Sequence, residues 1–164
     1  LQRLLNQGDE VALCLAEDRA TFTVGNATLS TSLLQVEFPN YRQLIQPSYP
    51  NTLTVAREAL LEAVRRCRIF ARETTPVRLE MTATSLKLSV ITQDIGNSEE
   101  EIDCSLEGTE MIVGFNPEYL AAGIEAVTGD EITIQTTDPQ RPAVLRGVGA
   151  EDYLYLVMPQ RLTV

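Results

Sequence analysis

The sequence predicts an α+β fold in which one structural unit, a strand followed by a helix and three further strands, is used twice. Short runs of alternating apolar and polar residues, typical of half-buried strands, recur along the 164 residues. Two longer stretches carry apolar residues at helical spacing instead. The order of elements repeats after roughly 50–60 residues, which implies a pseudo-twofold domain with two helices side by side on two small antiparallel sheets.

The first part of the chain, residues 1–48, is predicted to hold the end of a helix, three strands and a linker. The opening LQRLLNQGDE is typical of the tail of an amphipathic helix, so we expect further residues to precede Leu1. Several prolines and polar residues after the strands indicate a linker, with a domain boundary near Ser48. The strands are expected at residues 11–18, 20–25 and 27–34.

The first copy of the repeated unit contains the clearest helix of the chain. It is predicted over residues 56–73 because apolar residues recur there at helical spacing, and Thr52 or Thr54 is the expected N-cap. Gly96-Asn97 provides turn chemistry before the last strand of this copy. The strands of the first copy are expected at residues 52–55, 77–83, 85–92 and 99–107.

The second copy of the unit follows the same order. Its helix is expected over residues 116–128, because Asn116 is a favourable N-cap and Pro117 occupies the first helical position, where a missing N–H costs nothing. Gly129-Asp130 indicates a turn directly after this helix. The strands of the second copy are expected at residues 110–115, 131–138, 142–147 and 153–159.

Composition removes several classes of function. The chain has no histidine, which excludes the commonest general base, Ser-His-Asp and Cys-His catalysis and the usual catalytic zinc sites. It has no GxSxG, P-loop or GxGxxG motif and no apolar run long enough for a membrane span. Cys14, Cys67 and Cys104 are expected to be buried free thiols in a reducing cytoplasm. We therefore predict no catalytic residues, no cofactor and no metal site.

The charge pattern combines an acidic body with one arginine-rich stretch. A net charge of −10 argues against a nucleic-acid surface when the chain is taken as a whole. Four of the 13 basic residues nevertheless lie close together, at Arg65, Arg66, Arg68 and Arg72. Three of them share one face of the predicted helix, and Arg66 flanks that face. The pattern fits a solvated helix face paired with Glu62 and Glu73, and the alternative is a phosphate-binding surface.

Two further features leave alternatives open. Paired carboxylates at Glu99, Glu100, Glu101 and Asp103 suggest an acidic metal-dependent hydrolase, but their alternation with Ile102 and Cys104 fits a strand with one solvated face. The tail YLYLVMPQRLTV, together with apolar residues of the linker, is either a core strand with a loose end or part of a groove for a short peptide. A purely structural β-rich assembly module is the third alternative.

Three segments together resemble the bacterial DNA sliding clamp, the ring-shaped beta subunit of DNA polymerase III. They are FPNYRQLIQPSYP at 38–50, EMIVGFNPEYL at 110–120 and YLYLVMPQRL at 153–162. The resemblance covers essentially the whole chain. It implies that residues 1–48 are the back half of the clamp's middle domain plus a linker, and that residues 49–164 are its C-terminal domain. It also implies the DNA clamp (processivity) fold.

The resemblance implies a DNA polymerase processivity factor for DNA replication and no enzyme. Sliding clamps form head-to-tail homodimeric rings of six similar domains, with helices lining the hole and sheets forming the outer wall. Such a ring encircles double-stranded DNA and tethers polymerase, clamp loader and repair proteins through short linear motifs, in the cytoplasm and without a membrane. Ile69 and Phe70 match apolar residues of the ring interface, although their pattern alone fits core residues equally well. The residues implied to face DNA are Arg3, Arg65, Arg66, Arg68 and Arg72.

The clamp's peptide-binding pocket lies between its middle and C-terminal domains, and the resemblance maps it onto this sequence. The implied pocket residues are Pro39, Gln43, Leu44, Asn116, Tyr119, Gln140, Pro142, Leu156, Met158, Pro159, Gln160 and Arg161. Apolar members would accept hydrophobic side chains of the motif, and polar members would fix its backbone. The sequence departs from the family at position 43, where a basic residue is replaced by Gln, and at position 160, where methionine is replaced by Gln. We therefore expect an altered motif preference.

Overall fold

The computed structural model describes residues 1–72, 75–92, 96–150 and 153–162. The chain divides into two compact units, residues 1–40 and residues 41–164. No helix in the described ranges has the length and apolar character needed to cross a bilayer; the longest has 12 residues.

The first unit is a small three-stranded antiparallel sheet in the order β1-β2-β3. Its strands confirm the predicted ones, whereas the expected α-helical start is a 3-10 helix without buried residues. Every residue of β1 is exposed, so the prediction of a buried thiol is wrong for Cys14, which lies on this strand. The elements are η1 (Gln2–Gln7), β1 (Val11–Leu15), β2 (Arg19–Val24) and β3 (Ala27–Ser32).

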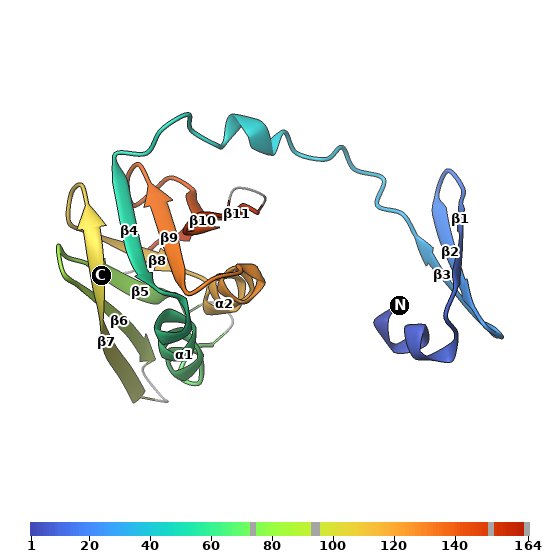
Figure 1. Ribbon diagram of the computed structural model, residues 1–164, viewed down its shortest axis with the longest axis horizontal. Helices are drawn as coiled ribbons and strands as arrows, with labels where there is room; N and C mark the ends of the chain where they lie inside the picture. The colour runs from blue at the N-terminus through green and yellow to red at the C-terminus, as the bar shows by residue number, and fades with distance from the viewer. Residues whose placement is uncertain (73–74, 93–95, 151–152, 163–164) are drawn as a thin grey trace. The chain divides into compact units, whose positions relative to one another are not determined.

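The second unit contains the doubled strand–helix–strands pattern (Figure 1), and the first copy has the predicted order of elements. In the second copy the single strand predicted at residues 153–159 is wrong, because it is split into two short strands on either side of Met158. A short 3-10 helix, η2 (Tyr41–Gln43), precedes it. The first copy consists of β4 (Asn51–Ala56), α1 (Arg57–Arg68), β5 (Val77–Met81), β6 (Ser85–Thr92) and β7 (Gly96–Glu107). The second copy consists of β8 (Met111–Phe115), α2 (Pro117–Ala126), β9 (Glu131–Thr136), β10 (Ala143–Gly147), β11 (Tyr155–Val157) and β12 (Pro159–Gln160).

The two copies exchange strands. Their first strands pair across the domain, β4 with β9 and β8 with β5, so that neither copy forms its sheet alone. The resulting strand order is β11-β10-β9-β4-β7-β6-β5-β8-β12, with all pairs antiparallel. The predicted two small sheets are joined by the long strand β7, whose first part pairs with β6 and whose last part pairs with β4.

One hydrophobic core serves both copies. Helices α1 and α2 lie side by side (Figure 1) and bury residues of both against the strands. Small residues allow their close packing, including Ala63 on α1 and Ala121 on α2. Cys67 is fully buried in this core, and burial raises the pKa of its thiol, whereas Cys104 is half-buried. The buried-thiol prediction is therefore confirmed for Cys67 alone.

Three local predictions in the first copy are wrong. Helix α1 ends at Arg68, because the next three amide groups bond three residues back and Phe70 packs against the core. The expected end at Glu73 lies outside the described residues. Neither predicted threonine caps the helix; its first N–H, on Arg57, donates to the Asp130 carbonyl at 2.8 Å. Gly96 and Asn97 form no turn, since both pair with β6.

The start of α2 confirms the predicted cap. The Asn116 side-chain oxygen accepts hydrogen bonds from the amide groups of Glu118 at 2.8 Å and Tyr119 at 3.3 Å, and Pro117 follows as the first helical residue. This cap is a purely local interaction, so the helix begins where the sequence predicts.

We expect Gly123→Ala to lower the free energy of unfolding by about 1–3 kcal/mol. Alanine favours a helix over glycine, but a Cβ at position 123 would lie 2.5 Å from Cδ1 of Tyr155, which packs on α2. Chemical denaturation measures the change. In a Tyr155→Ala background the same substitution should become neutral or stabilising; an equal loss in both backgrounds would contradict this explanation.

Candidate functional site

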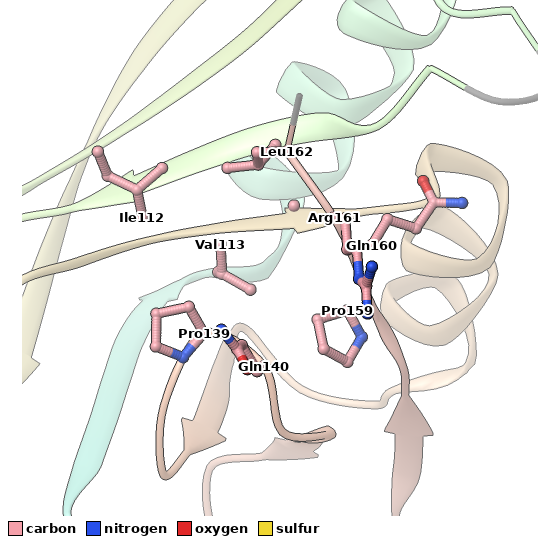
Figure 2. A pocket seen from close by; sticks show the side chains of 9 residues that line it. Ile112, Val113, Pro139, Gln140, Pro159, Gln160, Arg161 and Leu162 are labelled. Atoms are coloured by element: carbon pink, nitrogen blue, oxygen red, sulfur yellow. The ribbon is translucent and has the colours of Figure 1, made fainter. Parts of the chain in front are cut away.

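A cavity of about 540 Å³ lies where the C-terminal segment passes strand β8 and the turn after β9 (Figure 2). It is part of the second unit, and its lining combines apolar residues with three polar side chains. The lining residues are Ile112, Val113, Gly114, Pro139, Gln140, Pro159, Gln160, Arg161 and Leu162.

The cavity depends on the short strand β12. In the antiparallel pair with β8, Pro159 lies opposite Phe115 and Gln160 opposite Gly114. A Cβ at Gly114 would lie 2.7 Å from Cδ2 of Leu162 and 3.0 Å from the Gln160 carbonyl oxygen, so a larger residue here would displace the Leu162 side chain and crowd β12. The opposite wall is a turn in which the Gln140 amide donates to the Asp138 carboxylate at 2.8 Å.

Four of the twelve pocket residues implied by the sequence meet in this cavity: Gln140, Pro159, Gln160 and Arg161. Two other members are exposed, Met158 between β11 and β12 and Tyr119 on α2, with 58% and 63% of their surface accessible. Sequence reasoning missed Ile112, Val113, Gly114, Pro139 and Leu162.

The other implied pocket residues lie elsewhere in the described chain. Asn116 caps α2, and Leu156 pairs with Val144 in the sheet. Pro142 directly precedes β10. Gln43 ends η2 and Leu44 follows it, while Pro39 belongs to the first unit.

Gln160 carries an unusual feature of the cavity wall. Its side-chain oxygen is buried and has no hydrogen-bond partner among the described residues. Figure 2 shows this side chain directed away from Pro139 and Gln140. A buried acceptor without a partner costs about 1–3 kcal/mol of stability. The protein is therefore less stable with Gln160 than it would be with an apolar side chain of similar shape at this position.

The implied DNA-facing arginines lie on two elements. Arg65, Arg66 and Arg68 occupy the last turn of α1, Arg72 follows that helix, and Arg3 belongs to η1 of the first unit. Each of the three on α1 forms an ion pair with a glutamate. The two residues implied at the ring interface differ in exposure. Ile69 is 75% exposed, whereas Phe70 packs partly against the core.

The residues of the acidic run on β7 alternate between the two faces of that strand. Glu99, Glu101 and Asp103 are exposed on one face, as expected for a strand with one solvated face. Glu99 pairs with Lys87 at 2.7 Å. Glu100, on the other face, accepts hydrogen bonds from Arg66 that lower the pKa of its carboxyl. The described residues contain no cluster suited to a metal ion, and the hydrolase alternative is not supported.

The family model described as DNA polymerase III beta subunit, C-terminal domain, matches residues 42–161. The chain belongs to this family. It is 32% identical to the beta sliding clamp of Synechococcus elongatus and 30% identical to that of Streptomyces coelicolor, with 99% and 98% of the chain aligned. These alignments include 45% and 46% of the two relatives, so the chain spans about half the length of the curated relatives it matches.

Solved sliding clamps have the same fold. The DnaN sliding clamp of Bartonella birtlesii, solved bound to griselimycin, is 27% identical and superposes with a TM-score of 0.81 over 98% of this chain and 44% of its own. The sliding clamp of Pseudomonas aeruginosa, solved with a ligand, is 26% identical with a TM-score of 0.77 over the same shares. The predicted DNA clamp fold is confirmed.

We expect Gln160→Met to raise the free energy of unfolding by about 1 kcal/mol, because it removes the buried oxygen that has no partner. Denaturant titration measures the change. The matched control is Gln140→Met, the same substitution at an exposed position of the same cavity, for which a change within about 0.5 kcal/mol is expected. A less stable Gln160→Met protein would show that the amide is satisfied in solution.

Proposed function

We propose that this chain is part of a bacterial sliding clamp, a non-catalytic processivity factor for DNA replication in the cytoplasm. Residues 1–48 would contribute to its middle domain and residues 49–164 would form its C-terminal domain. The whole protein would close as a head-to-tail homodimer around double-stranded DNA. It would tether polymerase, clamp loader and repair proteins through short linear motifs.

Family membership together with the cavity beside β12 carries this proposal. The cavity offers apolar walls and a small number of polar groups, which suits a short peptide with hydrophobic side chains. Met158, exposed directly before the lining residue Pro159, adds an apolar side chain beside the cavity. Large exposed apolar side chains next to a formed cavity favour a binding surface over a purely structural module.

The proposed DNA-facing and ring-interface residues fit a protein that holds DNA by topology. A closed ring does not need high affinity, because it stays on DNA while free to slide. Exposed arginines on α1 would give weak phosphate contacts, and the net charge of −10 would repel DNA that is not threaded. Ile69, exposed directly after α1, would pack against the partner subunit in the ring.

The pocket is tested by fluorescence anisotropy with a labelled pentapeptide in which two polar residues flank a leucine and a Leu-Phe pair ends the motif. We expect saturable micromolar binding. Met158→Ala should weaken it by about 1–3 kcal/mol, the range of a binding hot spot, because it removes an exposed apolar contact.

Ile91→Ala is the matched control, since Ile91 is 68% exposed on β6 and lies outside the cavity lining. It should leave the dissociation constant unchanged. Equal effects of the two substitutions, or an unchanged dissociation constant in a folded Met158→Ala protein, would contradict the pocket assignment.

A further inference from the structure

The arginines on α1 are held by glutamates of the neighbouring helix. Arg65 pairs with Glu125 at 2.9 Å, and Arg68 pairs with Glu118 at 2.5 Å. The two arginines are one helical turn apart on α1, and the two glutamates are two turns apart on α2. Two ion pairs therefore bridge the helices.

Arg66 is engaged even more fully. Its Nε and Nη2 atoms donate to the two carboxylate oxygens of Glu100 at 2.9 Å and 3.0 Å, a bidentate arrangement. Its Nη1 atom lies 3.3 Å from Glu62, one turn earlier on α1. All three arginines of the last turn of α1 thus form ion pairs with carboxylates of the same domain.

The net charge of the two helices is zero. Helix α1 carries four arginines and two glutamates, whereas α2 carries two glutamates and no basic residue. A surface that is to meet phosphate usually has a positive balance. Here the positive groups are present, but each has a partner in the absence of DNA.

These partners are exchangeable. The side chains of Arg65, Arg68, Glu118 and Glu125 are each about half exposed. Ion pairs at such exposure are weak, because water and salt screen them. A phosphate approaching the helices can therefore take a guanidinium from its glutamate, but the carboxylate that is left then repels the phosphate.

We propose that Glu118 and Glu125 are built-in competitors of DNA phosphate for Arg65 and Arg68, and that they keep the contact between this helix pair and DNA weak. This inference rests on the proposed DNA-encircling function. The guanidinium groups move from one anion to another and are never left without a partner. The result is a contact that forms and breaks easily, as a sliding surface requires, with a shallow dependence on salt.

The test compares binding of a short DNA duplex by the full chain and by Glu118→Gln/Glu125→Gln, using NMR titration of ¹⁵N-labelled protein at low salt. The substitutions keep the side-chain size and remove both competing charges. We expect about five- to tenfold tighter binding, with a steeper loss as salt is added. The shifted signals should be the backbone amides of α1 and α2 and the Nε–Hε groups of Arg65 and Arg68.

A matched control separates the helix pair from overall charge. Glu99→Gln/Glu101→Gln makes the same change in net charge on the solvated face of β7, opposite to the face on which Glu100 meets Arg66. It should leave DNA binding within about twofold of the unmodified chain. An equal gain in both double variants would overturn the proposal, since it would reflect net charge alone.

Substitution of the arginines distinguishes failure of the proposed competition from failure of the DNA-facing role on which it rests. Adding Arg65→Gln/Arg68→Gln to the Glu118→Gln/Glu125→Gln protein should abolish the gain, and a gain that persists would overturn the competition. If the arginine substitutions weaken binding while the glutamate substitutions change nothing, the DNA-facing role stands and the competition fails. If DNA shifts no α1 or α2 signal in any of these proteins, both fail.

Discussion

The pairing of β4 with β9 and of β8 with β5 is the constraint on which the rest of the second unit depends. The first strand of each copy lies between the two copies: one of its edges pairs with a strand of the other copy, and its other edge pairs with the closing segment of its own copy. This pairing brings α1 and α2 together over one core. It also caps α1, because the register of β4 against β9 places the Asp130 carbonyl at the first amide of that helix.

The cavity follows from a difference between the two copies. In the first copy, β7 runs unbroken for 12 residues and pairs with β6 and then with β4. In the second, the corresponding closing segment is interrupted at Met158 between β11 and β12, and Pro159 has no N–H to donate. The segment then passes over Gly114 and leaves a space beside the turn at Pro139. This irregularity in an otherwise repeated plan thus leaves a cavity, and some of its lining residues are ones that the family resemblance also implies.

Sequence reasoning succeeded where structure is local and failed where distant segments meet. The cap at Asn116 needs only the next three residues, and the positions of the strands along the sequence need only alternation. The end of α1 depends on Phe70, which packs into the core while its carbonyl accepts a hydrogen bond from Thr92 at 2.7 Å, and periodicity cannot show either contact. Ile112, Val113 and Leu162 likewise line the cavity only because β12 pairs with β8. The tail residues Pro159, Gln160 and Arg161 were found through family resemblance, since their pattern alone fits a loose end equally well.

The repeat preserves the fold of its two copies but not their charge. Helices α1 and α2 occupy equivalent places in the two units and share one core, yet the basic residues are all on α1. Packing constrains only the buried faces, so the exposed faces of the two helices are free to diverge. The two helices now carry net charges of opposite sign. Ion pairs across their exposed faces therefore neutralise these charges, which two helices of identical charge could not do. A symmetric pair of basic helices would bind phosphate tightly and a symmetric pair of acidic helices would repel it, whereas the charges of this pair sum to zero.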